Sequence, residues 1–349
     1  MKLGLNLGYW GAGNDADNLA LALEADRLGF SVVWAAEAYG SDSPTVLAWV
    51  GARTERVDLG AAVMQIPART PAMTAMTAAT LDTLSGGRFR LGLGVSGPQV
   101  SEGWHGVRFD KPLGRTREYV EIVRSALRRE RVRYDGEHYQ LPLPDGPGKA
   151  LALTVHPVRA EIPLYLAAVG PKNLELTGEI ADGWLAIFYS PEHSKESLAA
   201  LRAGQQKAGR SEVAMDVAVT TPIVVDDDVA VAAEPVRNYC ALYLGGMGSR
   251  QQNFYNALAV RMGFEEAAAE IQNRYLSRDY VGAAAAVPQE FIDATSLLGP
   301  VERIADRMQA LADSGVTTVS LAPNVGTLEQ RLETMRSAVA AVERAGLAS

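Results

Sequence analysis

The chain has 349 residues, of which 48% are hydrophobic and 21% charged, and its net charge is −8. A negative chain without a long basic stretch offers no electrostatic support for binding nucleic acid. One cysteine excludes an internal disulfide, and the four histidines are too scattered for a metal site.

Strand-like and helix-like segments alternate from the first residue onward. Apolar runs predict eight strands, at 2–10, 31–37, 57–67, 88–97, 162–170, 184–190, 213–227 and 315–323. Helical patterns between and after them predict helices at 15–30, 43–54, 71–87, 114–130, 171–183 and 327–346. Eight such repeats predict an α/β fold of the (β/α)8 TIM-barrel type. A doubly wound open sheet is the alternative, but no early GxGxxG turn supports it.

The repeats are interrupted once on a large scale. Residues 228–300 have helical patterns at 229–245, 250–260 and 263–286. We interpret this stretch as a helical insertion between strands seven and eight, within a single domain of residues 1–349. It would cover the barrel mouth or form an oligomer surface.

The sequence also bears on the compartment. The start, MKLGLNLGYWGAG, is too short and too glycine-rich for a signal peptide. No apolar run reaches the roughly 18 residues that a membrane helix needs. With a single cysteine, these features predict a cytoplasmic protein that binds neither membrane nor nucleic acid.

In such barrels the site lies at the carboxyl ends of the strands. The residues at the ends of the first five predicted strands are, strand by strand, Gly8, Tyr9 and Trp10; Glu37, Tyr39 and Ser41; Met64, Gln65 and Pro67; Ser96, Gln99 and Glu102; and Val169, Gly170, Pro171 and Lys172. They include no Ser-His-Asp triad, nucleophile elbow or metal cluster. Glu37 and Glu102 as an acid/base pair on a sugar are one alternative. So few titratable groups are more typical of a site whose chemistry is left to a cofactor.

Two stretches point to where a cofactor would lie. In LGAAVMQIPARTP (59–71), three very small residues in a strand suggest that something bulky approaches the backbone. In AAVGPKN (167–173), a strand ends and a helix begins near Pro171, so free amides and Lys172 would hold a phosphate. A plain strand-to-helix turn is the alternative for the second stretch.

Four segments resemble a known family. They are AEAYGSD (36–42), the stretch 59–97, LYLAAVGPKNLELTGEIADGW (164–184) and GVTTVSLAP (315–323). They resemble the luciferase-like monooxygenase superfamily, and most closely its coenzyme F420-dependent branch, which includes methylenetetrahydromethanopterin reductase and F420-dependent glucose-6-phosphate dehydrogenase. The most specific motifs, TLDTLSGGRFRLGLG and IADGW, do not distinguish F420 from FMN.

The resemblance implies roles for individual residues. It places a non-proline cis peptide at Ala62–Val63, against the central ring of a flavin or deazaflavin. The cofactor-binding residues that it implies are Glu37, Ala62, Val63, Gln65, Ser96, Gly97, Val169, Gly170, Pro171 and Lys172. Where the sugar-phosphate dehydrogenases have a catalytic histidine, this chain has Ala38, so that role is not carried over.

From the resemblance we expect an enzyme, a coenzyme F420-dependent oxidoreductase that transfers a hydride between deazaflavin C5 and a small organic substrate. Glu37 would be the catalytic residue, and Tyr9, Trp10 and His105 would line the substrate. The first alternative is an FMN-dependent monooxygenase, and the second is a non-catalytic flavin- or F420-binding protein. No metal is expected, and relatives commonly form homodimers.

Overall fold

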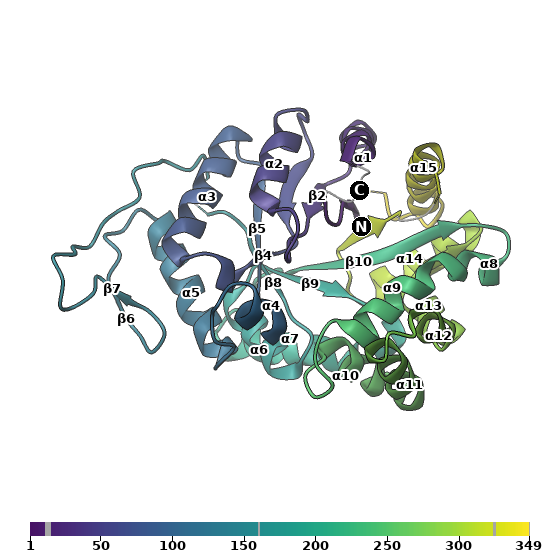
Figure 1. The fold of residues 1–349 in the computed structure, drawn as a ribbon. Coiled ribbons are helices and arrows are strands. Elements are labelled where there is room, and N and C mark those ends of the chain that lie inside the picture. Colours follow the sequence, from purple (N-terminus) through teal and green to yellow (C-terminus); the bar gives the residue numbers. More distant parts are fainter. Residues whose placement is uncertain (11–14, 160, 324–325, 349) are drawn as a thin grey trace.

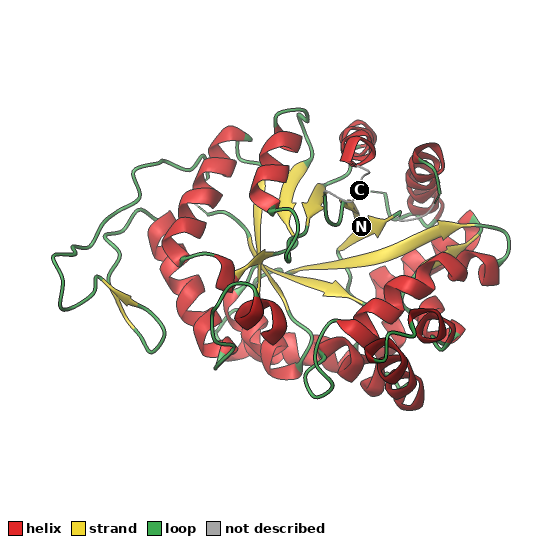
Figure 2. Ribbon diagram, viewed as in Figure 1, coloured by secondary structure: helices red, strands yellow, loops and turns green. Residues whose placement is uncertain are grey.

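The computed structural model describes residues 1–10, 15–159, 161–323 and 326–348. Eight parallel strands form a closed barrel, surrounded by helices (Figures 1 and 2). The strands are β1 (Lys2–Asn6), β2 (Val32–Ala35), β3 (Asp58–Ala61), β5 (Phe89–Gly94), β8 (Leu164–Ala167), β9 (Gly183–Ile187), β10 (Asp216–Val225) and β12 (Thr318–Ala322). The barrel closes because β12 pairs with both β1 and β10. The predicted (β/α)8 fold is confirmed.

The outer layer has one main helix for each strand. These are α1 (Asp15–Leu28), α2 (Ser43–Gly51), α3 (Pro71–Leu84), α5 (Pro112–Leu127), α6 (Pro171–Ile180), α7 (Lys195–Lys207), α14 (Val301–Asp313) and α15 (Leu328–Arg344). Strand side chains alternate, so Leu3 and Leu5 face the helices whereas Gly4 and Asn6 face the barrel axis. The main apolar core therefore lies between the strands and this helical layer.

Some predicted strands are shorter than expected. β1 ends at Asn6, and residues 7–10 of the predicted first strand leave the sheet. The predicted strand 57–67 is divided into β3 and a two-residue strand, β4 (Met64–Gln65), with a 3₁₀ turn (Ile66–Ala68) after it. The division falls at Ala62 and Val63, which belong to neither strand. Their backbone therefore lies outside the regular strands, at the mouth of the barrel.

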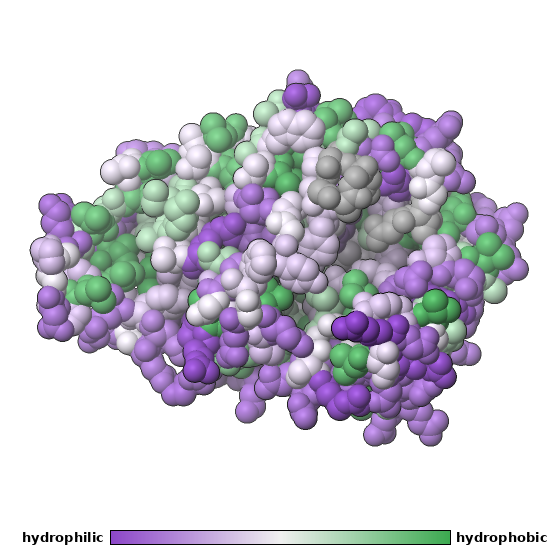
Figure 3. Space-filling model, viewed as in Figure 1, coloured by the Kyte–Doolittle hydropathy of each residue, from purple (hydrophilic) through white to green (hydrophobic). Residues whose placement is uncertain are grey.

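The helical insertion lies between β10 and β12, as predicted. It consists of α8 (Val229–Ala233), a 3₁₀ turn (Glu234–Val236), α9 (Arg237–Ala241), a π-helical turn (Leu242–Gly246), α10 (Phe254–Arg261), α11 (Glu265–Leu276), α12 (Tyr280–Ala285), α13 (Gln289–Ala294) and the short strand β11 (Leu297–Gly299). One predicted helix, 263–286, is two helices, because Arg278 takes a positive φ of 66° and Asp279 caps α12. In Figure 3 the outer surface of this region, at the lower right, is largely hydrophilic.

A second excursion leaves the barrel on the opposite side. The short helix α4 (Pro98–Gly103) follows β5, and a small hairpin of β6 (Tyr134–Asp135) and β7 (Gln140–Leu141) projects at the left of Figure 1. This hairpin lies in the long connection between α5 and β8, a stretch that contains several prolines and glycines. The chain after it returns along α3, where Arg159 pairs with the buried Asp82.

Candidate functional site

The barrel interior changes character toward the carboxyl ends of the strands. Lower down, the inward side chains of Val32, Trp34 and Ala218 are almost fully buried. At the carboxyl ends Asn6 and Thr220 are only half-buried, and Asn6 Nδ2 donates a 3.3 Å hydrogen bond to Thr220 Oγ1. The barrel is therefore plugged below and open at its mouth, where (β/α)8 barrels carry their sites.

Trp34 accounts for part of the small-residue stretch in the third strand. A Cβ on Gly60 would overlap the Trp34 ring, and one on Gly4 would crowd its Nε1. Tyr165 packs edge-on against the same ring, with 5.3 Å between the centroids. The bulky neighbour of Gly60 is thus a side chain of the barrel, whereas Ala62 lies closer to the open mouth.

Glu37, after the end of β2, is only 8% exposed. Arg69 binds it at two points, Nη1 to Oε1 at 2.5 Å and Nη2 to Oε2 at 3.0 Å. The backbone N–H groups of Gln65 and Ser43 donate to the same two oxygens at 2.9 and 3.0 Å. A carboxylate offers about four acceptor positions, so these bonds occupy them all. Glu37 therefore joins the loops after β2 and β3 and has no free lone pair for a ligand.

Gln65 continues this network toward β5. Its Nε2 donates to the carbonyl of Ala38 at 2.6 Å, and its Oε1 accepts from Ser96 Oγ at 2.6 Å. Ser96 has a positive φ of 64°, which is uncommon outside glycine and marks a specific local geometry. Gly97, next to it, begins α4 as its N-cap. The structure thus brings Glu37, Gln65 and Ser96 together as one hydrogen-bonded wall.

Ala62 and Val63 form a half-buried ledge at the mouth. A cis peptide bond joins them, at the position that the resemblance implies. The N–H of Ala62 donates to Ala35 at 2.9 Å, and the Val63 side chain packs over Gly94, where a Cβ would lie only 2.6 Å from it. The ledge is therefore held from below and leaves a flat surface facing the mouth.

The loop between β8 and α6 offers backbone donors. Gly170 is the N-cap of α6 without a side-chain cap, and the first turn holds no acidic residue. Within the described chain, no hydrogen bond is made by the N–H groups of Gly170 and Lys172. Lys172 is exposed, Val169 is half-buried, and Pro171 occupies N1. A helix N-terminus with a cation beside it suits an anion.

The predicted substrate residues are separated by the fold. Tyr9 faces the insertion, whereas the Trp10 ring packs edge-on against Trp49 of α2 at 5.6 Å. His105 follows α4, and its buried Nε2 has no hydrogen-bond partner in the described part of the chain. Tyr9 thus lies beside Tyr243 of the insertion, and the backbone N–H of Trp10 donates to Ser41 Oγ at 2.9 Å. The substrate roles of Tyr9, Trp10 and His105 stay predictions.

Opposite the Glu37 network lies an aromatic surface that we call the tyrosine wall, formed by Phe188, Tyr239, Tyr243 and Tyr255. Phe188, just after β9, has a positive φ of 52° and contacts all three tyrosines, with centroids 5.2 to 6.1 Å away. Tyr243 lies 4.8 Å from Tyr239 and 5.0 Å from Tyr255. Burial raises the pKa of all three phenols, so at neutral pH they are hydrogen-bond donors.

Sequence reasoning did not assign Arg69 or the tyrosine wall. Arg69 stands between two prolines directly after a strand, and a cation at a strand end opposite Glu37 was a usable signal for an ion pair. Tyr239 and Tyr243 are four residues apart and so share a helix face. That pattern shows one aromatic face but does not show that the face turns toward the barrel.

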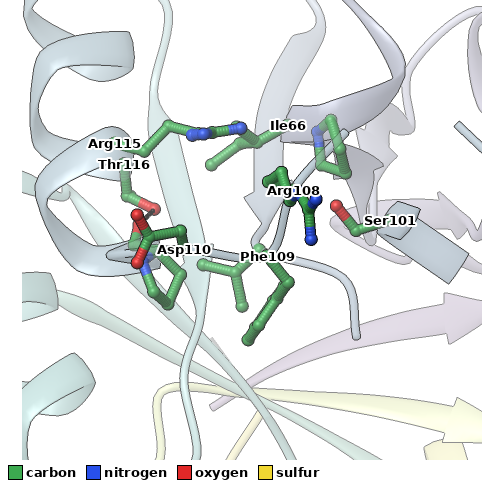
Figure 4. A pocket seen from close by; sticks show the side chains of 10 residues that line it. Ile66, Ser101, Arg108, Phe109, Asp110, Arg115 and Thr116 are labelled. Atoms are coloured by element: carbon green, nitrogen blue, oxygen red, sulfur yellow. Dashed lines mark hydrogen bonds between the residues drawn. The ribbon is translucent and has the colours of Figure 1, made fainter. Parts of the chain in front are cut away.

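Two cavities lie at the edge of the mouth, and the second is lined by Val169 of the β8–α6 loop as well as by Phe188. One lies under the loop that leads to α5, with Arg108, Asp110 and Arg115 around Phe109 (Figure 4), and encloses about 250 Å³. The other lies between β9, α7 and α10 and encloses about 390 Å³. Both volumes include space open to solvent.

The described residues contain no group of three or more His, Cys, Asp or Glu side chains that could hold a metal ion. None of the described helices combines the length and the apolar character that crossing a membrane requires.

Comparisons with known proteins agree with this geometry. The sequence profile of luciferase-like monooxygenases matches residues 9–318. A Mycobacterium tuberculosis protein named as a coenzyme F420-dependent oxidoreductase is 45% identical over 95% of this chain and 96% of its own length. The 5,10-methylenetetrahydromethanopterin reductase of Archaeoglobus fulgidus is 30% identical over 86% of this chain and 88% of its own.

A solved structure gives the same picture. The coenzyme F420-dependent tetrahydromethanopterin reductase of Methanopyrus kandleri superposes with a TM-score of 0.81 and 26% identity, covering 96% of both chains. The similarity therefore extends over the barrel and the insertion together.

Proposed function

The chain belongs to the luciferase-like monooxygenase family, and on that premise we propose that it is an oxidoreductase that uses coenzyme F420. Its relatives named for F420 cover nearly its whole length. The observation that carries the proposal is the half-buried ledge of Ala62 and Val63 together with the uncapped start of α6. A flat ring system with an anionic tail needs both surfaces.

The residues fit such a cofactor. The ledge would support the ring, and the N–H groups of Gly170 and Lys172 would bind the phosphate of the tail. A Cβ at Gly170 would meet only open space, so there is room for a ligand at the loop. Val169, Pro171 and Gly97 would line the same path. The bound cofactor supplies hydride chemistry, and the chain supplies binding, orientation and electrostatics.

Glu37 has a different part in this proposal from the catalytic one expected. With four hydrogen bonds to its carboxylate, it positions Gln65 and the ledge instead of exchanging a proton with substrate. Gln65 and Ser96 extend this support to the next strand. Such fixed support holds a cofactor in one orientation without rearrangement.

Binding of the cofactor is directly measurable. We expect purified protein to bind F420 in an absorbance or fluorescence titration, and to oxidise reduced F420 when an organic acceptor is present. Gly170→Asp would place a carboxylate at the phosphate position, where it would cap α6 and repel an anion. We expect this variant to remain folded and to bind F420 at least about tenfold more weakly.

Gly170→Ala is the matched control, because its Cβ has room and carries no charge. It should bind F420 as the unaltered protein does. Tight binding of FMN without binding of F420 would overturn the proposal in favour of a flavin enzyme. Binding of F420 without turnover with any acceptor would leave a carrier protein instead.

A further inference from the structure

The hydroxyls of the tyrosine wall meet one another. The Tyr243 hydroxyl is in hydrogen-bonding contact with those of Tyr9 and Tyr239. Two such contacts use two of the three O–H groups, so one O–H of this chain is left to donate to another group. The three rings of the wall are half-buried, so their edges reach the space above the barrel. Burial raises the pKa of Tyr9 as well, and its hydroxyl lies beside that of Tyr243. The donor that is left calls for an acceptor on a ligand.

Tyr243 is the most firmly held of these residues. It lies in the π-helical turn, where the change of helical register leaves backbone carbonyls without their usual partners. Asn253 Nδ2 donates to the carbonyls of Tyr243 and Leu244 at 2.9 and 3.0 Å. On the other side, Gly245 packs so closely against Tyr275 of α11 that a Cβ would overlap it. The turn that presents the Tyr243 ring is therefore fixed before any ligand arrives.

Glu37, Arg69 and two arginines of the insertion are already paired. Arg69 neutralises Glu37. In the insertion, Arg237 is bound to Glu234 and to a backbone carbonyl, and Arg261 of α10 donates to the carbonyl of Val169. This leaves no free carboxylate for a cationic substrate and no free arginine for an anionic one among these groups. The space beside the tyrosines suits a neutral molecule with an acceptor oxygen.

We propose that this space binds a neutral ketone or enone and that Tyr243 is the catalytic proton donor to its carbonyl oxygen. The proposal rests on the proposed function, because reduced F420 is the hydride source. In a ketone the carbonyl carbon would gain the hydride and the electron pair of the C=O bond would move to oxygen. In an enone the β-carbon would gain it, the C=C pair would form a double bond between the α-carbon and the carbonyl carbon, and the C=O pair would move to oxygen, so that protonation gives an enol. That oxygen takes the proton of the Tyr243 hydroxyl. Tyr243 is reprotonated from Tyr9, which is 41% exposed and in contact with water.

A first test uses a probe that reports its own protonation state. The yellow anion of 4-nitrophenol resembles the oxyanion that forms during reduction, and it can be titrated into the F420-loaded protein. We expect the protein to bind this anion and to lower the apparent pKa of the probe. Tyr243→Phe keeps the ring and removes the donor, so the bound anion should decrease by about tenfold or more.

A second test measures turnover with cyclohex-2-en-1-one and reduced F420. We expect kcat to fall about 100-fold in Tyr243→Phe with a much smaller change in KM, because general acids contribute at least this much. Tyr280→Phe is the control, since this substitution removes the same hydroxyl group at an exposed position of the insertion. Thermal unfolding of both variants shows whether the fold is retained.

The outcomes separate the two proposals. Equal anion binding and equal kcat in both variants would overturn the role of Tyr243. Failure of the unaltered, F420-loaded protein to bind 4-nitrophenol or to reduce the enone would overturn the assignment of a neutral carbonyl substrate. Failure to bind F420 at all would overturn the proposed function, and the proton donor with it.

Discussion

The two ends of the barrel use similar chemistry for opposite purposes. At the closed end Arg90 donates to Asp58 at 2.8 Å and lies 3.4 Å from Asp216, which also accepts from Tyr165 at 2.8 Å. These groups point toward the barrel axis and fill it. Burial by itself would lower the pKa of Arg90, but the surrounding acidic groups raise it, so the guanidinium remains charged.

At the mouth the corresponding arginine is Arg69, which is half-buried, and its partner is the buried Glu37. This pair lies in the wall, where it fastens the backbone of Ser43 and Gln65, and the axis stays open. A buried ion pair in this fold therefore does not by itself mark a catalytic group. The feature that marks the functional end is the half-buried ledge of Ala62 and Val63 beside this pair.

Removing either arginine should have the greatest consequences for stability. Arg69→Met leaves the buried Glu37 carboxylate without its cation, so it should lower the free energy of unfolding by about 3–5 kcal/mol. Arg90→Met does the same to the half-buried Asp58 and Asp216 and should cost less, about 1–3 kcal/mol. Urea unfolding measures this. Only Arg69→Met should also weaken F420 binding, by about tenfold or more, because only Arg69 supports the ledge. Equal weakening by folded Arg90→Met would contradict the division between the two ends.

A smaller loss of stability than in Arg69→Met is expected at Gly60 in the third strand, where a substitution tests which group lies against this glycine. In Gly60→Ala the new Cβ would overlap the Trp34 ring, so we expect a loss of about 1–3 kcal/mol of stability. F420 affinity should be unchanged, because Gly60 lies below the ledge. The double variant Gly60→Ala, Trp34→Leu should recover part of the loss. A variant of normal stability that no longer binds F420 would show that Gly60 faces the cofactor instead.

The barrel fold could be predicted from the sequence. Alternating strand and helix patterns persist through eight repeats, and a closed parallel sheet with outer helices is the arrangement that buries them all. The strand-end rule then named Glu37, Gln65 and Ser96, which the structure joins by hydrogen bonds. Neighbouring strands deliver these residues, so topology was enough.

The rest depended on tertiary packing. The acid–base role expected for Glu37 did not take Arg69 into account. An arginine between two prolines after a strand signals an ion pair, but it does not show that the pair forms with an earlier strand end. The tyrosine wall was missed for a related reason. Its rings converge only through the π-helical turn and the contact of the insertion with Phe188. Helical periodicity gives a face, but it does not give the orientation of an insertion.

A third prediction compares lysines at the two ends. Lys172 lies at the start of α6, and Lys2 lies at the closed end, at the start of β1. Both are exposed, so their electrostatic effects are modest and screened by salt. Lys172→Ala should weaken F420 binding about two- to fivefold at low salt and less at high salt. Lys2→Ala, with the same loss of charge, should leave binding unchanged. Equal effects would attribute the loss to net charge alone.

The smallest effect concerns the outer helical layer, remote from both networks. Hydrogen bonds from Arg27 and Arg336 hold the pKa of Glu24 at about 2, against 4.5 for a free side chain, and link α1 to α15. The lowered pKa means that this stabilisation is complete above pH 4.5 and is lost as the pH falls toward 2. Because the pair lies near the surface, Glu24→Gln should cost less than about 1 kcal/mol at neutral pH. The difference from the unaltered protein should shrink progressively in urea unfolding at acidic pH, whereas Glu212→Gln, an exposed change, should show no such trend. A cost that stays constant with pH would mean that packing of the side chain, and not its charge, joins the first and last helices.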